Sequence, residues 1–139
     1  MNKKDIPIVH KIGSSQNAFS SSNGVFWSID QLTKWCRSKK DVLLVSELNH
    51  QIIGFVLFSS HVPTGKVTWE NLFVLPEYRK NGVASLLTKE GLRRLNLLGY
   101  KYIMGCVNAD DKKSILNLVK KFKFVIGNKV VWIDLLLKK

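Results

Sequence analysis

Residues able to form disulfides or to bind metals are scarce in this sequence. It has two cysteines, Cys36 and Cys106, which lie too far apart to form a CxxC pair. The three histidines, His10, His50 and His61, are also scattered, without the spacing typical of a metal site. We therefore expect a reduced protein that has no bound metal.

Long apolar runs are missing as well. No stretch approaches the roughly 20 apolar residues that a membrane-spanning helix needs. The charged start of the chain, residues 1–7, is not followed by an apolar stretch of signal-peptide length. These absences favour a cytoplasmic protein that does not enter a membrane.

Acidic residues are the third shortage, with 10 Asp and Glu against 22 Lys and Arg and a formal net charge of +12. From Lys101 onward there are nine lysines, against Asp110, Asp111 and Asp134. Such an excess attracts polyanions, so nucleic acid and the phosphates of a nucleotide cofactor are both candidate partners. A lysine-rich, solvated surface without a specific partner explains the charge equally well.

The composition is typical of a single folded domain spanning residues 1–139. Hydrophobic residues make up 45% of the chain and the mean hydropathy is close to zero, as in globular proteins. A chain of this length buries a core without disulfides or metals. No internal repeat or interdomain linker is visible, and the most loop-like stretch is the Ser- and Asn-rich segment 13–24.

The first half of the chain predicts a strand, a helix and a three-stranded meander. Residues 6–12 form the first predicted strand. Ser28 and Gln31 have the spacing of a capping box, which opens a helix through about Ser38. The expected buried residues of this helix are Ile29, Leu32, Trp35 and Cys36. The meander consists of strands at residues 41–48, 51–60 and 67–75, joined by turns at Asn49-His50 and Pro63-Thr64-Gly65.

The second half predicts a crossover, a further helix and a hairpin. Residues 82–98 have the apolar spacing of a helix and residues 100–107 have that of a strand. A strand, a helix of this length and another strand require the two strands to be parallel. The next helix is capped by Asp110 or Asp111. The apolar positions of the two helices are Ala84, Leu87, Gly91, Leu95 and Leu98 in the first, and Ile115, Leu118, Val119 and Phe122 in the second.

Two strands at residues 124–126 and 129–137 complete the expected fold. The order is β-α-βββ-α-β-α-ββ, a mixed α/β fold. It implies a central mixed sheet of about seven strands with helices on both faces.

The turn after the third meander strand has the features of a phosphate site. It combines two cations, Arg79 and Lys80, with Gly82 and a helix N-terminus. Free backbone N–H groups and the helix dipole favour a bound phosphate there, and Gly82 allows a close approach because it has no Cβ. Arg79 and Lys80 would add charge-assisted contacts. An ordinary strand-to-helix turn with basic surface residues would have the same composition.

The segment Arg79-x-x-Gly82-x-Ala84, preceded by Val-x-Pro-Glu-Tyr, resembles the [QR]-x-x-G-x-[GA] loop of the Gcn5-related N-acetyltransferase (GNAT) superfamily. The predicted order of elements matches that family from end to end. The resemblance implies that the loop binds the pyrophosphate of acetyl-CoA and that the preceding strand pairs with the pantetheine arm. It also implies that this strand splays from strand 100–107, leaving a slot for the thioester. The cofactor-binding residues implied are Phe73, Val74, Arg79, Lys80, Asn81, Gly82, Val83, Ala84, Ser85 and Asn108.

Glu70 is the carboxylate that the sequence favours as a general base. Acetyl transfer needs the neutral amine, so a base is expected beside the thioester. Glu70 lies in an otherwise largely apolar strand, where an acid is costly unless it is functional or paired. Residues 69–74 also resemble a stretch of polyamine and related acetyltransferases in which a glutamate serves as base, usually through water. The alternative is a structural role, as a cross-strand partner of a lysine or as a solvent-facing residue.

The donor of a proton to the leaving thiolate is where this sequence departs from the family. Many members have a tyrosine in the last helix, where this chain has Val119, and a glycine where it has Lys123. Valine cannot donate a proton. Another donor such as Cys106, Tyr102 or Tyr78, a thiolate that leaves unaided, and a lost activity are the open explanations.

Three functions are compatible with these patterns. The first is transfer of the acetyl group of acetyl-CoA to a primary amine of a small molecule, peptide or protein, by direct attack in a ternary complex. The second is a noncatalytic acyl-CoA-binding module, suggested by Val119. The third is an acetyltransferase for an RNA- or ribosome-associated amine, suggested by the charge. A monomer and a homodimer paired through residues 130–137 are equally compatible with the sequence.

Overall fold

The computed structural model describes residues 1–15, 26–107 and 110–127. Asn108, the predicted strand 129–137 and most of the loop 13–24 lie outside these residues. The chain divides into two compact units, Met1–Gly105 and Cys106–Lys139, which are described separately. No helix in the described part of the chain is both long and apolar enough to span a membrane.

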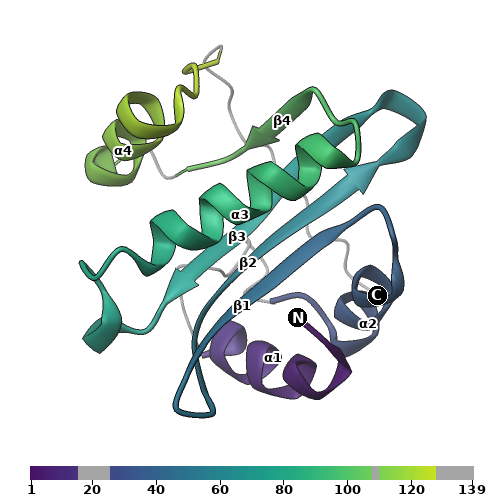
Figure 1. Cartoon of the computed structure of the whole chain (residues 1–139), viewed down its shortest axis with the longest axis vertical. Coiled ribbons are helices and arrows are strands. Elements are labelled where there is room, and N and C mark those ends of the chain that lie inside the picture. The colour runs from purple at the N-terminus through teal and green to yellow at the C-terminus, as the bar shows by residue number, and fades with distance from the viewer. Residues whose placement is uncertain (16–25, 108–109, 128–139) are drawn as a thin grey trace, which may run out of the picture. The chain divides into compact units, whose positions relative to one another are not determined.

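The first unit is built on a four-stranded sheet with the strand order β1-β2-β3-β4. Strands β1, β2 and β3 form an antiparallel meander, and β4 runs parallel to β3 (Figure 1). The bounds are Val42–Leu48 for β1, Gln51–His61 for β2, Lys66–Val74 for β3 and Tyr102–Gly105 for β4. Helix α3, Val83–Leu97, makes the crossover from β3 to β4. The predicted meander and βαβ crossover are both confirmed.

The link between β1 and β2 is the two-residue turn that the sequence indicates. Asn49 and His50 both have positive φ angles, 49° and 64°, and Leu48 pairs with Gln51. Positive φ at both central residues is the geometry of a type I′ hairpin turn, whose twist matches that of the strands. Asn tolerates this conformation better than most residues, which explains its place in the turn.

The N-terminal segment is a helix, so the strand predicted at residues 6–12 is wrong. Helix α1 spans Ile6–Ser14, with Pro7 in its first turn, where a missing N–H costs no hydrogen bond. Ile6, Val9 and Gly13 are buried whereas Ile8 is 47% exposed. The apolar residues therefore follow the helical spacing of three and four residues. Both periods were compatible with this short run, and packing against the sheet selects the helical one.

Helix α2, Ile29–Arg37, begins at the predicted cap. The hydroxyl of Ser28 accepts a hydrogen bond from the Gln31 backbone N–H at 3.1 Å. Leu32 is buried in the core, and Trp35 and Cys36 pack against it. Ile29 was also expected to be buried, but it is 47% exposed, because the first turn of the helix lies outside that core cluster.

The sheet separates two apolar layers. Phe55 and Leu57 of β2 face the layer shared with α1 and α2, and Val56 and Phe58 face the layer shared with α3. Figure 1 shows α3 on one face of the sheet and α1 and α2 on the other. Gly91 lets α3 approach closely, since a Cβ there would lie 2.4 Å from the Phe58 ring. Helices on both faces of a mixed sheet are therefore confirmed.

Most of the predicted buried stripe of α3 is confirmed. Leu87, Gly91 and Leu95 are buried and Ala84 is half-buried. Leu98 was also expected on this stripe but is 46% exposed, because it lies just beyond the last residue of the helix.

The second unit contains helix α4, Lys112–Phe122, which begins at the predicted Asp111 cap. Lys123 ends the helix in the left-handed conformation with a φ of 59°, and the Phe124 N–H then donates to the Leu118 carbonyl at 3.2 Å. This turn uses the N–H that a strand would need, so the strand predicted at residues 124–126 is wrong. The described residues therefore form four strands, not about seven.

Candidate active site

The parallel pairing of β3 with β4 is short. It covers Lys66 to Trp69 on β3 and Tyr102 to Gly105 on β4. Beyond Trp69, residues 70–74 continue β3 without a β4 partner. Within the described part of the first unit, this edge of β3 therefore has main-chain N–H and C=O groups that no strand pairs. An extended chain could bind there by strand-like hydrogen bonds.

A β-bulge lies where this pairing stops. On the other side of β3, Asn71 pairs with Leu57 and Trp69 pairs with Phe58, so Glu70 is the extra residue of the bulge. A bulge bends its strand and changes the direction of nearby side chains, and it occurs often beside active sites. The predicted base thus lies at the one irregular position of the β2–β3 ladder.

The Glu70 carboxylate is half-buried and accepts a hydrogen bond from the hydroxyl of Ser59 on β2. Burial raises the pKa of Glu70 above its ordinary value of 4.5, and the charge of Asp41 raises it further, while the Ser59 hydrogen bond lowers it. Burial is the largest of these effects. Because Ser59 makes this hydrogen bond, the cross-strand partner of Glu70 is a serine and not a lysine. A half-buried carboxylate with a raised pKa is a better proton acceptor than an exposed one.

Asp41 itself is held by the end of β2. Its Oδ1 atom accepts hydrogen bonds from the Ser60 backbone N–H at 2.6 Å and from the Ser60 hydroxyl at 2.8 Å. Ser59 and Ser60 thus bind one carboxylate each. Sequence reasoning missed both serines, because neither lies in a motif and only the register of β2 brings them to the two acids.

An aromatic pair flanks the bulge on the α2 side of the sheet. The Trp27 indole N–H donates to the side-chain oxygen of Asn71 at 2.8 Å. Trp27 also packs edge-on against Trp35, with ring centroids 4.9 Å apart. Trp27 is 37% exposed, so it presents apolar surface beside the residue that follows Glu70. Sequence reasoning missed this contact, which joins positions 44 residues apart.

The loop after β3 folds back on the strand. A short 3-10 turn, Pro76–Tyr78, leads to Arg79, whose Nε donates to the Val74 carbonyl at 2.9 Å. The Arg79 guanidinium also lies 5.7 Å from the centre of the Phe73 ring. Arg79 therefore fixes the loop against the end of β3. Its predicted contact with a phosphate is not tested by this geometry.

The loop ends in two left-handed residues that flank Asn81. Lys80 has a φ of 67° and Gly82 a φ of 82°, and Gly82 is the N-cap of α3. A Cβ at Gly82 would meet no atom within 4 Å, so the space before the helix is open. The cap makes no side-chain hydrogen bond, and the first-turn N–H groups of a helix have no partner within it. The positive end of the α3 dipole lies at the same point.

The other predicted cofactor residues follow the loop or precede it. Val83, Ala84 and Ser85 form the first turn of α3. Phe73 and Val74 have buried side chains. Phe73 lies opposite Phe55 in the β2–β3 ladder, and the Val74 carbonyl accepts the hydrogen bond from Arg79. Tyr78 and Tyr102, two of the candidate acids, belong to the first unit, whereas Cys106 and Val119 belong to the second.

A surface hollow of about 360 Å³ is lined by residues that include Trp35, Asp41 and Arg94, at the end of the sheet remote from Gly82. It therefore does not coincide with the predicted phosphate loop.

Among the described residues, no group of three or more His, Cys, Asp or Glu side chains is placed to bind a metal.

Comparisons with known proteins agree with this geometry. The model of the acetyltransferase (GNAT) family matches residues 14–124. No curated protein sequence matches the chain. The aminoglycoside N-acetyltransferase AAC(6')-Iy in complex with CoA is similar in structure, with a TM-score of 0.75, 18% identity, and coverage of 96% of this chain and 90% of that chain.

Two other solved structures share the fold at low sequence identity. An aminoglycoside acetyltransferase from an uncultured soil metagenomic sample has a TM-score of 0.73 and 16% identity, covering 99% of this chain and 93% of that one. The ribosomal-protein-S18-alanine N-acetyltransferase from Escherichia coli has a TM-score of 0.64 and 18% identity, covering 83% and 68%. Since the family model matches most of the sequence, the chain belongs to the acetyltransferase (GNAT) family.

Proposed function

We propose that this protein transfers the acetyl group of acetyl-CoA to a primary amine by direct attack in a ternary complex. The observation that carries the proposal is the end of the β3–β4 pairing at Trp69 and Gly105, next to Glu70 on its bulge. CoA-bound relatives of the same fold support acetyl-CoA as the donor. The names of two relatives, an aminoglycoside acetyltransferase and a ribosomal-protein-S18-alanine N-acetyltransferase, support an amine as the acceptor.

The α3 N-terminus is the proposed pyrophosphate site. The backbone N–H groups from Asn81 to Ser85 and the dipole of α3 would bind the phosphates, with Lys80 adding charge. Gly82 leaves open space in front of the helix, so the phosphate group could approach the main chain closely. Arg79 would act by fixing the loop on Val74 and by its positive charge. Asn108 remains a proposed contact of the pantetheine arm.

The edge of β3 beyond its pairing with β4 is the proposed site of the pantetheine arm. The main chain of Phe73 and Val74 would pair with its amides. The arm would then extend along β3 toward the bulge, placing the thioester beside Glu70.

Glu70 is the proposed general base. It accepts a proton from the ammonium group of the acceptor, directly or through a water. The neutral amine then attacks the thioester carbonyl, the C–N bond forms as the C–S bond breaks, and the nitrogen loses its second proton to solvent. General-base help of this kind is worth roughly 10² to 10⁴ in rate. The thiolate then takes a proton from a group that is not assigned, since Val119 stands where the resemblance predicts a tyrosine in many family members.

The test is consumption of acetyl-CoA in the presence of small amines, peptides with a free N-terminus, and aminoacylated RNA. Saturable turnover with one of these classes is the expected result. Tight binding of acetyl-CoA without turnover on any class would instead favour the noncatalytic acyl-CoA-binding module that Val119 suggests. We further infer a cytoplasmic protein that works as a monomer or a homodimer.

A further inference from the structure

The bulge of β3 places two consecutive polar side chains on one face of the sheet. Trp69 and Leu72 both pack in the layer shared with α3, and Glu70 and Asn71 lie between them in the sequence. Asn71 is opposite Leu57, which belongs to the layer shared with α1 and α2. Successive residues of a regular strand point to opposite faces, so two residues on one face between Trp69 and Leu72 require the bulge. A carboxylate and an amide therefore lie side by side on the α1 and α2 face.

Trp27 fixes the orientation of the Asn71 amide. The indole N–H of Trp27 donates to Asn71 Oδ1 at 2.8 Å. An indole nitrogen can only donate, so its partner is the amide oxygen, and the NH2 group lies on the other side of the amide. Among the described residues no other hydrogen bond involves the Asn71 side chain, and no buried side-chain nitrogen or oxygen is without a partner. The Asn71 NH2 group is therefore accessible to a ligand.

Trp27 is itself held by a second contact. Its ring packs edge-on against Trp35 of α2, with ring centroids 4.9 Å apart. Edge-to-face packing is a favourable arrangement of two aromatic rings, so the indole N–H has a defined position beside Asn71. The NH2 group of Asn71 is thus oriented by a chain of two contacts before any ligand binds.

Glu70 and Asn71 together offer an acceptor and a donor to one small molecule. The Glu70 carboxylate accepts from the ammonium of the acceptor amine, whereas the Asn71 NH2 group donates only to an acceptor atom. Consecutive Cα atoms are about 3.8 Å apart, so the two groups of the ligand must also be close together. A nitrogen and an oxygen on adjacent carbon atoms meet this requirement. An alkylamine of the same size would leave the Asn71 donors without a partner in the complex.

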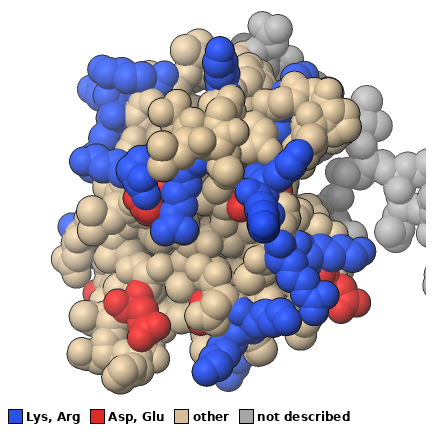
Figure 2. All heavy atoms as spheres, turned by 45° about the vertical axis from the view of Figure 1, so that its right-hand side comes forward, with Lys and Arg blue, Asp and Glu red and all other residues tan. Residues whose placement is uncertain are grey.

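The charge of the chain argues against a second ammonium as the group that is recognised. The net charge is +12, and Figure 2 shows a face on which Lys and Arg clearly outnumber Asp and Glu. An amine with several positive charges would be repelled by this excess. Asp41, whose charge acts on Glu70, already accepts two hydrogen bonds from Ser60. A neutral oxygen therefore suits the position beside Asn71 better than a cation.

We propose that Asn71, oriented by Trp27, is a specificity-determining residue that selects primary amines with an oxygen atom on the carbon next to the amine-bearing carbon. The Asn71 NH2 group donates to this oxygen, which belongs to a hydroxyl or a carbonyl, while Glu70 accepts from the ammonium. Trp27 is a positioning residue because it acts through Asn71. The inference rests on the proposed function, which places the amine beside Glu70.

The test compares kcat/KM for ethanolamine and for propylamine, which has a methyl group in place of the hydroxyl, with acetyl-CoA as the donor. Glycinamide supplies a carbonyl oxygen in a third series. Asn71→Leu removes the donors at similar size, so it should lower the ratio of ethanolamine to propylamine by about tenfold, the worth of one hydrogen bond. The rate for propylamine should not change. Because the ratio is compared between proteins, the different basicities of the amines do not affect the result. Equal ratios in the wild type and the variant, for both the hydroxyl and the carbonyl series, would overturn the proposal.

The role of Trp27 is tested by Trp27→Phe, which keeps an aromatic ring but removes the N–H. This variant should lower the ratio in the same direction. Combining it with Asn71→Leu should cause no further loss, because the two residues act as one unit. Losses that add would show that Trp27 acts independently of Asn71 and would overturn its positioning role.

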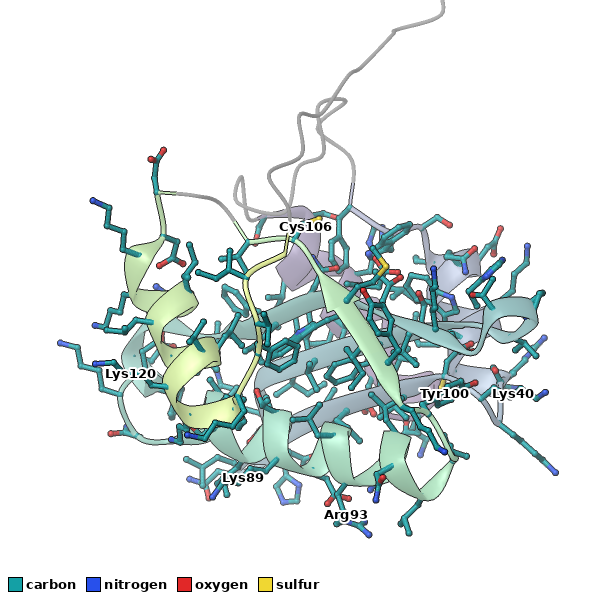
Figure 3. All side chains as sticks on the ribbon, turned by 90° about the horizontal axis from the view of Figure 1, so that it is seen from above. Lys40, Lys89, Arg93, Tyr100, Cys106 and Lys120 are labelled. Carbon is teal, nitrogen blue, oxygen red and sulfur yellow. The ribbon has the colours of Figure 1, made fainter. Side chains whose placement is uncertain are left out.

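Asn96→Leu is the matched control, since it makes the same substitution at an exposed position of α3, on the opposite face of the sheet from α2 (Figure 1). Figure 3 shows two other residues of this helix, Lys89 and Arg93, on its outer side, away from the sheet. The control should leave the ratio unchanged, and melting temperatures check that all variants remain folded. A loss in the control equal to that in Asn71→Leu would overturn the proposal.

Failure of the proposed function would be recognised separately. Acetylation of amines with a ratio that Asn71→Leu does not change would refute this inference and leave the proposed function in place. If no amine is acetylated, the proposed chemistry is refuted, and binding to the complex with CoA then decides the inference. The side-chain NH2 signals of Asn71 in NMR spectra should shift with ethanolamine and not with propylamine. Identical responses to the two amines would overturn the inference.

Discussion

The Ser59 hydroxyl on β2 donates a hydrogen bond to the side chain of Glu70, the residue that the bulge leaves out of the main-chain pairing of β3 with β2. This contact fixes the only carboxylate of β3 beside the point where β3 and β4 separate. It also favours the ionised carboxylate, against the effects of burial and of Asp41. The pKa of Glu70 is therefore set by burial, by Ser59 on β2 and by Asp41 just before β1, and these two side chains can be changed separately.

Replacing Glu70 with glutamine tests its role as base. Glu70→Gln should lower kcat by roughly 10²-fold or more, because general-base help is lost while the size of the side chain is kept. In the wild type, activity should fall as pH falls through the raised pKa of Glu70. The variant should lack this acidic limb in its pH profile of kcat/KM. Near-native turnover with an unchanged profile would assign Glu70 a structural role.

The same variant has an expected effect on stability. Burial raises the pKa of Glu70 in the folded protein, so between the ordinary and the raised value the folded chain retains a proton that the unfolded chain has lost. Stability from this group is therefore present at lower pH and lost as pH rises through that window. Glu70→Gln should be at least as stable as the wild type at neutral pH in denaturant titrations, which also excludes misfolding as the cause of lost activity.

Ser59 gives a second, independent test. Ser59→Ala removes the one effect that lowers the pKa of Glu70, so the acidic limb of the kcat/KM profile should move to higher pH. Ser59→Thr retains the hydroxyl and should restore the wild-type limb. If alanine and threonine variants have the same limb as the wild type, the hydrogen bond does not influence the base.

Much of the first unit was predictable because its signals are local. The Asn49-His50 turn, the Ser28 cap and the apolar stripe of α3 each depend on residues within a few positions of one another. The two wrong strand predictions concern short runs of residues that are compatible with more than one secondary structure. Residues 6–12 fit both periods, and only burial of Val9 against the sheet decides for a helix. At residues 124–126, the left-handed Lys123 redirects the chain, which composition does not reveal.

The candidate site was predictable only in part, for a related reason. Glu70 and the loop from Arg79 to Gly82 are contiguous in sequence, so a motif can identify them. Strand register brings Ser59 to Glu70, the charge of Asp41 acts on Glu70, and Trp27 reaches Asn71 from the segment before α2. The pairing of β2 with β3 shifts by one residue at the bulge. The spacing of residues in the sequence does not predict this shift.

Acetyl-CoA should raise the melting temperature of the wild-type protein. A ligand that binds only the folded state stabilises it by mass action, by about 2.7 kcal/mol at 100 times its Kd. Differential scanning fluorimetry over a range of acetyl-CoA concentrations measures the effect. An unchanged melting temperature at millimolar acetyl-CoA would contradict the proposed donor.

Gly82 should be required for that stabilisation. Gly82→Val puts a branched side chain into the open space before α3, so it should weaken acetyl-CoA binding by about tenfold or more in calorimetry. It also strains a residue with a φ of 82°, at a cost of about 1–2 kcal/mol. Gly99→Val is the matched control, since Gly99 has a φ of 84° and equally open surroundings but lies after α3. Similar acetyl-CoA affinities of the two variants would show that this loop does not bind the pyrophosphate.

Val119, which is half-buried on α4, occupies the position at which the family resemblance predicts a tyrosine in many members. If this position faces the thioester and no other group donates a proton, Val119→Tyr should place a phenol beside the departing sulfur and raise kcat. The larger ring could cost about 1–3 kcal/mol in stability through overpacking, so unfolding must be measured in parallel. Asn117→Tyr adds the same ring at an exposed position of α4 and should leave kcat unchanged. A folded Val119→Tyr variant with unaltered or lower kcat would show that another donor protonates the thiolate or that the thiolate leaves unaided. A gain of activity from an inactive wild type would instead show that the native chain is a noncatalytic acyl-CoA-binding protein whose proton donor has been lost.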